Sequence, residues 1–241
     1  MKKPFLALAA IGVLALSSPV LANDNEEGEC GISKSVVAKI QAQLATVVTM
    51  DNGGLFTPNR MWSAVVDRKG VLCSVISTGD AWPGSRAIAI AKASTANDFS
   101  NSALALSTAN VFSPTQPGGS LYGLNNSNPF NPEFLPQGQG LGQVPGGIIT
   151  FGGGVALYSG NTVIGGLGVS GDTSCADHVI AFRMRRLAGF GTVPKGVASV
   201  PPNSDNIIYD ITPNPDGGTG ISAGGFGHPH CSSGDIDPSK I

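Results

Sequence analysis

The order of hydrophobic and polar positions predicts a protein of mixed helices and strands. Apolar residues three or four positions apart, or alanine-rich runs, indicate helices over residues 33–50, 83–96, 101–109 and 174–187. Short apolar runs between turn residues indicate strands over residues 61–66, 71–77, 148–151, 155–158 and 162–169. The turns at 67–70 and 159–161 join neighbouring strands as hairpins. Because hairpins pair antiparallel strands, we expect an antiparallel sheet with helices packed against it.

The first 22 residues have the pattern of a secretory signal. Lys2 and Lys3 precede a short apolar run, which Pro19 and the segment 20–22 bring to an end. The run is too short to cross a bilayer, and the alternative is a buried N-terminal helix. We expect cleavage after Ala22, a polar leader over 23–32 and a periplasmic or secreted protein without a membrane span.

Composition limits the possible domain organisations and the classes of binding partner. Only 12% of the residues are charged and no basic patch is present, which argues against a nucleic-acid partner. So few charges in an exported chain favour a homo-oligomer. We expect one domain over 33–190, interrupted by a Pro/Gly-rich insertion at 113–147 that packs on a partner subunit, and a Pro/Gly-rich extension over 191–241.

Four cysteines in an exported chain indicate disulfides rather than a metal site. Three connectivities are possible. The strand 61–66 returns to the start of the first helix, so that Cys73 in the next strand lies near Cys30. This favours a Cys30–Cys73 bridge and leaves Cys175 and Cys231 to hold the tail over the helix 174–187.

A glycine-rich segment between a strand and a helix offers one candidate binding site. Residues 166–171 fit G-x-G-x-x-G, but the acidic residue and the second parallel strand of a dinucleotide fold do not follow. Backbone N–H groups at a helix start can still hold a carboxylate or phosphate. Asp172 and Asp177 oppose an anion there, and capping of the helix is their alternative role.

A few polar side chains are candidates for ligand contact. His178 is a candidate haem or metal ligand or acid–base group, with an ordinary polar residue at a helix start as the alternative. Arg86, Lys92 and Thr95 share a predicted helix and either contact an anionic ligand or form a solvated face. The segment 228–231 (His-Pro-His-Cys) has metal-ligand chemistry, which a disulfide at Cys231 would remove. We expect Met184, Trp62 and Trp82 in the core or at an interface.

Three motifs together resemble the GlcG/HbpS family of haem-binding proteins. They are Val65-Val66-Asp67-Arg68-Lys69-Gly70, Lys92-Ala93-Ser94-Thr95-Ala96-Asn97-Asp98-Phe99, and Ile164-Gly165-Gly166-Leu167-Gly168-Val169-Ser170-Gly171 with Asp177 after it. The resemblance implies a profilin-like, three-layer α/β/α sandwich around a five-stranded antiparallel sheet. It also implies oligomers, and haem or iron binding in exported members.

The resemblance and the candidate residues together predict an exported protein that binds haem, or a similar planar carboxylated ligand, in haem or iron handling or sensing. We expect a binding protein rather than an enzyme. His178 is the expected iron ligand, and the expected contacts to the rest of the ligand are Arg86, Lys92, Thr95, Gly168, Ser170 and Gly171. The alternatives are a protein that binds or converts a small organic acid, and a structural or interaction oligomer without a ligand.

Overall fold

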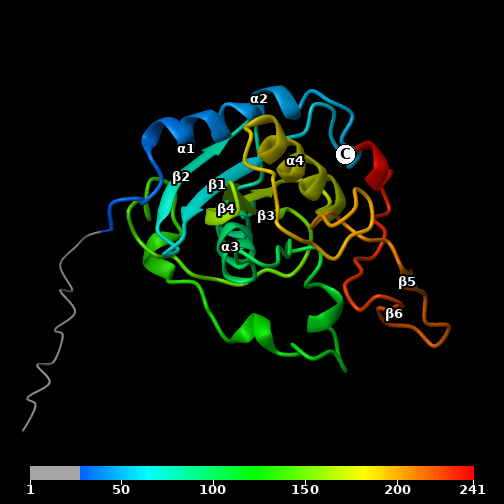
Figure 1. Ribbon diagram of the computed structural model, residues 1–241. Coiled ribbons are helices and arrows are strands. Elements are labelled where there is room, and N and C mark those ends of the chain that lie inside the picture. The colour runs from blue at the N-terminus through cyan, green and yellow to red at the C-terminus, as the bar shows by residue number, and fades with distance from the viewer. Residues whose placement is uncertain (1–27) are drawn as a thin grey trace, which may run out of the picture.

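The computed structural model describes residues 28–241, and its centre is an antiparallel sheet with helices on both faces. The expected signal and most of the leader lie outside the described residues. The strands are β1 (Trp62–Asp67), β2 (Leu72–Ser77), β3 (Gly154–Ser159) and β4 (Thr162–Ser170), in the spatial order β2-β1-β4-β3. Figure 1 shows α1 (Lys34–Gln41), α2 (Gln43–Val47) and α4 (Ser174–Leu187) above the sheet and α3 (Ser85–Asp98) below it.

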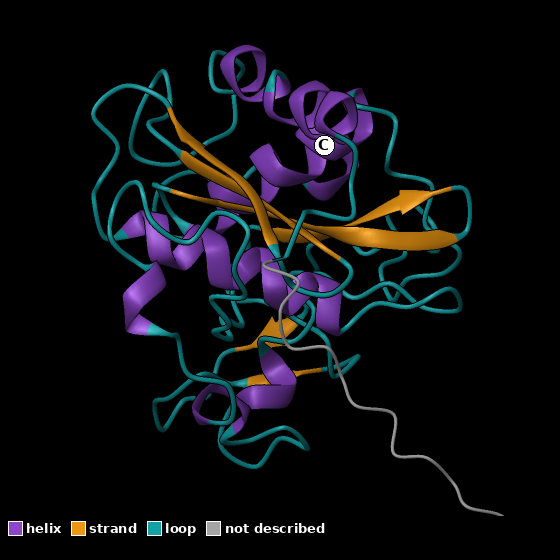
Figure 2. Cartoon of the chain, turned by 90° about the vertical axis from the view of Figure 1, so that its left-hand side faces the viewer, coloured by secondary structure: helices purple, strands orange, loops and turns teal. Residues whose placement is uncertain are grey.

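The sheet has four strands where the family resemblance implies five. The expected strand at 148–151 is irregular, because Ile149 donates its N–H to the Thr95 hydroxyl instead of to a neighbouring strand. The two hairpins form as predicted, with antiparallel pairing of β1 with β2 and of β3 with β4. The α+β class and the helix–sheet–helix layering (Figure 2) are therefore confirmed, whereas the profilin-like topology stays a prediction.

Two of the expected helices differ from the sequence pattern. The segment 33–50 forms two short helices, α1 and α2, which meet at Ala42. The segment 101–109 is not helical, because the Asn101 side chain accepts the N–H groups of Ala103 and Leu104 and so competes with helical hydrogen bonds. The other two, α3 and α4, form where the pattern places them.

The core lies on both faces of the sheet, and β1 shows how the chain divides it. Val65 packs with the apolar residues of α1, α2 and α4. Ala64 and Val66 point to the opposite face and pack against α3. Successive side chains of a strand alternate between faces, so one central strand supplies both cores. All six residues of β1 are buried.

The disulfides join Cys30 to Cys73 and Cys175 to Cys231, the pairing that the predicted order of elements favours. The second bridge holds the C-terminal tail against α4. The insertion also contacts its own chain: Gln143 and Gly142 exchange backbone hydrogen bonds with Leu72, and packing on a partner subunit stays a prediction. The short elements outside the main layers are η1 (Ser113–Thr115), η2 (Leu124–Asn126), η3 (Pro132–Phe134), β5 (Ile211–Thr212), β6 (Ile221–Ser222) and η4 (Pro238–Lys240).

Candidate functional site

Several conspicuous polar residues of the sequence lie together inside the protein, between the sheet, α4 and the tail. We call this set the buried polar cluster. Its members are Lys92, Asp177, His178, Arg185, Asp205, Asn206 and His228. Each is nearly inaccessible to solvent, so each must satisfy its charge or hydrogen-bonding capacity within the protein.

Lys92 and Asp177 form an ion pair across the core. The Lys92 ammonium nitrogen lies 2.6 Å from Asp177 Oδ2 and 3.2 Å from the Val169 carbonyl oxygen. It also lies 4.7 Å from the centre of the Phe151 ring. Burial raises the pKa of Asp177, against the opposing effect of Lys92, and burial lowers the pKa of Lys92. The second oxygen of Asp177 accepts the Asp172 N–H, and the cap of α4 is Thr173.

His178 and His228 are both buried and neutral. The Ile207 N–H donates to His178 Nε2 at 3.0 Å, and the Gly152 N–H donates to His228 Nε2 at 3.2 Å. Burial lowers the pKa of His178 to about 3 and that of His228 to about 4. His178 Nδ1 is fully enclosed and finds no hydrogen-bond partner among residues 28–241. Because Nε2 accepts a hydrogen bond and Nδ1 is buried, neither nitrogen of His178 can reach an iron. The site predicted around His178 therefore does not fit haem.

Arg86 and Thr95 hold the insertion onto α3. The two terminal nitrogens of Arg86 donate to the carbonyl oxygens of Leu135 and Gln139 at 2.6 and 2.7 Å. Thr95 donates to the Ala91 carbonyl and accepts from Ile149. Arg86, Lys92 and Thr95 are all buried, which rules out the solvated helix face considered as their alternative.

Two glycines allow close backbone contacts: Gly168 of β4 contacts α3, and Gly171, just after β4, contacts the segment before β1. A Cβ at Gly168 would lie 2.0 Å from the Ala89 carbonyl oxygen, and one at Gly171 would lie 2.1 Å from the Arg60 carbonyl oxygen. Ser170 ends β4 opposite Trp62 and is buried. The glycine pattern thus reflects backbone contacts.

The seven residues predicted to contact a ligand line neither of two cavities at the surface, one beside α1 and one beside the tail.

An open groove of about 460 Å³ lies between α1 and the edge strand β2. We call it the α1–β2 groove. Apolar side chains from both elements line it, with the Cys30–Cys73 disulfide among them: Ile32, Val37, Ala38 and Ile76. The polar lining residues are Glu29, Ser33, Lys34, Gln41 and Ser74. Lys34 is exposed, and within residues 28–241 it forms no ion pair.

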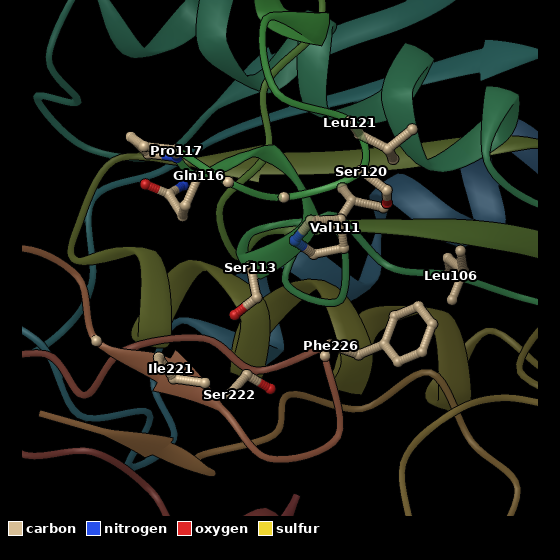
Figure 3. Close-up of a pocket in the computed structure, with 15 residues that line it drawn as sticks. Leu106, Val111, Ser113, Gln116, Pro117, Ser120, Leu121, Ile221, Ser222 and Phe226 are labelled. Carbon is tan, nitrogen blue, oxygen red and sulfur yellow. The ribbon is translucent and has the colours of Figure 1, made fainter.

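A second cavity, of about 540 Å³, separates the insertion from the tail (Figure 3). Figure 3 shows side chains of residues 106–121 on one side and of residues 221–226 on the other. Leu106, Val111, Leu121 and Phe226 are among its apolar lining residues. No ionisable side chain lines it, so it offers no charged partner to an anionic ligand.

The comparisons with known proteins place this fold in a family. The family model described as "Haem degrading protein HbpS-like" matches residues 37–184. The chain belongs to the HbpS-like family. The match spans the whole sheet and most of α1 and α4, whereas the whole extension (191–241) lies beyond it. No curated protein matches the chain.

Two solved structures support the same family fold. The ORFY protein of Klebsiella pneumoniae is 27% identical with a TM-score of 0.50, and the match covers 70% of this chain and 97% of that one. The chain in a PduOC:Heme complex is 25% identical with a TM-score of 0.51, and here 67% and 98% are covered. The second of these HbpS-like relatives was thus crystallised with haem.

The α1–β2 groove was not predicted from the sequence. Lys34 and Ala38 are ordinary exposed residues of an amphipathic helix, and Ile76 is one apolar residue in a strand. Only the packing of α1 beside an edge strand brings them together. One feature of the sequence could have indicated the groove. The pattern pairs strand 71–77 with a single hairpin partner, so this strand is expected at an open edge of the sheet.

Proposed function

We propose that the protein binds haem, or another planar apolar ligand with carboxylates, in the α1–β2 groove. The proposal rests on the apolar lining of a groove of about 460 Å³ and on Lys34, a lining cation that forms no ion pair within residues 28–241; Glu29 lies at the same rim and favours binding of the carboxylate beside Lys34. Ligand sites in proteins are commonly apolar concavities of about 300–1,000 Å³ with a few polar groups that fix orientation. The haem complex of the HbpS-like relative PduOC supports the choice of ligand.

The chemistry of the groove matches that of haem in two respects. The apolar side chains of Val37, Ala38 and Ile76 suit a porphyrin ring, and the Lys34 ammonium suits a propionate carboxylate. The lining contains no histidine, methionine or tyrosine. These are the common side-chain ligands of haem iron. We therefore propose that the affinity for haem comes from burial of the porphyrin ring and from the contact between a propionate and Lys34.

The cavity beside the tail is the weaker candidate for this ligand. It is the larger of the two, but its lining has no cation, and a carboxylate buried there would lose hydration without gaining a charged partner. The two disulfides are consistent with an extracytoplasmic location, and export remains our proposal. No described helix is long and apolar enough to cross a membrane. A homo-oligomer remains a prediction from the low charge content.

A hemin titration followed in the Soret region tests the proposed function. The oxidised protein should give a saturable shift, and Lys34→Glu should weaken it about tenfold, or about 1.4 kcal/mol. Lys39→Glu is the matched control, because Lys39 has the same charge on the same helix but does not line the groove. A wild-type shift no larger than that of an unrelated protein would refute haem binding. Equal weakening by both variants would refute the groove as its site.

A further inference from the structure

The disulfide of the tail lies beside a carboxylate and an imidazole. Cys175 Sγ, Cys231 Sγ and a carboxylate oxygen of Asp235 all lie within 4.8 Å of one another. His230 Nδ1 is 2.7 Å from Asp235 Oδ2, and the His230 side chain is 69% exposed. The Cys231 N–H donates to both oxygens of Asp235. Two sulfurs and a carboxylate thus meet where the tail reaches the start of α4, and an imidazole bonds to that carboxylate.

Reduction of this disulfide would leave two thiols beside Asp235, and loss of their protons would create a concentrated negative site. Two thiolates would face the Asp235 carboxylate at distances where like charges repel. The Cys175 N–H, 3.2 Å from Cys231 Sγ, and the Ser174 hydroxyl, 3.5 Å from it, favour a thiolate on Cys231. A divalent cation bound between the two sulfurs and the Asp235 carboxylate would neutralise the repulsion among these three negative groups. Thiolates with a carboxylate or imidazole are the ligands that Zn²⁺ takes in proteins.

The other disulfide has a similar composition but different surroundings. Cys30, Cys73 and Asp67 also lie within 4.8 Å of one another. Asp67, however, is buried and accepts the N–H groups of Gly31, Lys69 and Val71. Its oxygens hold the β1–β2 turn and the segment before α1, and a metal would have to displace those bonds. In the described part of the chain, the Asp235 oxygens bond only to Cys231 and His230, which are themselves part of this site.

We propose that the Cys175–Cys231 disulfide is a redox-gated site for a thiophilic divalent cation such as Zn²⁺. In the oxidised protein it holds the tail on α4. A dithiol reductant supplies two electrons and two protons, becomes a disulfide itself and leaves two thiols. On binding Zn²⁺ the thiols release their protons to solvent, and Cys175, Cys231 and Asp235 hold the ion. The exposed His230, which bonds to Asp235, orients that carboxylate, and a solvent molecule takes the fourth tetrahedral position.

Zinc titration of the purified protein against a chromophoric chelator tests the proposal. After reduction by a dithiol and removal of the excess, the wild type should bind one Zn²⁺, whereas the oxidised protein should bind none. The double variant Cys30→Ser/Cys73→Ser should keep the site, and Cys175→Ser/Cys231→Ser should lose it. Asp235→Asn keeps both cysteines and the oxidised fold and should weaken zinc binding by at least about tenfold.

Cobalt provides an independent readout of the ligands. Co²⁺ in the reduced wild type should show a thiolate-to-metal charge-transfer band, which Cys175→Ser/Cys231→Ser should abolish. Circular dichroism before and after reduction shows whether each sample is folded. The proposal is overturned if the reduced wild type binds no stoichiometric zinc, or if zinc binding survives in Cys175→Ser/Cys231→Ser and disappears in Cys30→Ser/Cys73→Ser.

Discussion

The α1–β2 groove and the buried polar cluster each contain a lysine, but in opposite surroundings. Lys34 is exposed at the edge of an apolar groove, whereas Lys92 is wholly enclosed and paired with Asp177. The buried ammonium contributes to the fold and has no path to a ligand. The exposed one is free to meet a carboxylate. Packing therefore decides which of two identical groups is available for binding.

The largest expected difference between the two regions concerns stability. Lys92→Met leaves the Asp177 carboxylate buried without its partner and should lower the free energy of unfolding by about 3–5 kcal/mol. Lys34→Met should change it by less than about 0.5 kcal/mol, because Lys34 is exposed and unpaired. Urea denaturation of both variants measures the difference. Equal effects of the two substitutions would show that the stability of the fold does not depend on the Lys92–Asp177 ion pair.

A substitution in β4 tests whether the glycine motif serves packing. Gly168→Ala places a methyl group against the Ala89 carbonyl, a backbone atom of α3 that cannot turn aside, and should cost about 2–3 kcal/mol. Gly84→Ala, at the start of α3, has open space around the new methyl and should be neutral or slightly stabilising. Thermal unfolding compares the two. A neutral Gly168→Ala would contradict the close packing of α3 on the sheet.

Acid should destabilise the protein through the buried histidines. His178 and His228 stay neutral in the fold, with pKa values of about 3 and 4, whereas the unfolded chain takes up protons near pH 6.5. The stability they contribute is present above pH 6.5 and is lost as the pH falls below it. Asp177 opposes this, because its raised pKa makes the folded state gain stability as the pH falls below about 6. The net loss from pH 7 to pH 5 should be about 2 kcal/mol.

Denaturation midpoints at pH 7 and pH 5 measure this loss. His228→Gln retains an acceptor for the Gly152 N–H and should reduce the net loss to about 0.5 kcal/mol, because Asp177 offsets most of the loss from the one remaining histidine. A stability that is constant or rises towards pH 5 would contradict the neutral, buried state of both rings.

The hairpins, α3, α4 and the pairing of the cysteines could be predicted, because local spacing and the order of elements determine them. The ligand contacts could not be predicted in the same way. Lys92 and Asp177 are far apart in the sequence, and only the packing of α3 under β4 shows that they neutralise each other. Gly168 fits a phosphate-binding motif and a close helix contact equally well, since both require the absence of a side chain.

The insertion and the tail are the least predictable parts. Their Pro/Gly-rich sequences have no periodicity, yet Arg86 fixes the insertion, and Asp205 pairs with Arg185 at 2.5 Å to fix the tail. Both anchors are long-range contacts to helices of the domain. The pattern of residues along the chain does not show which distant segment a buried arginine will contact.

The most direct test of the binding site compares hemin affinity in two variants. Ala38→Glu places a carboxylate in the α1–β2 groove, and His178→Gln changes the buried polar cluster without touching the groove. Circular dichroism confirms that both are folded before the Soret titration. Ala38→Glu should weaken hemin binding by about tenfold or more, while His178→Gln should bind hemin as the wild type does. Loss of the hemin shift in His178→Gln, with full binding in Ala38→Glu, would contradict it.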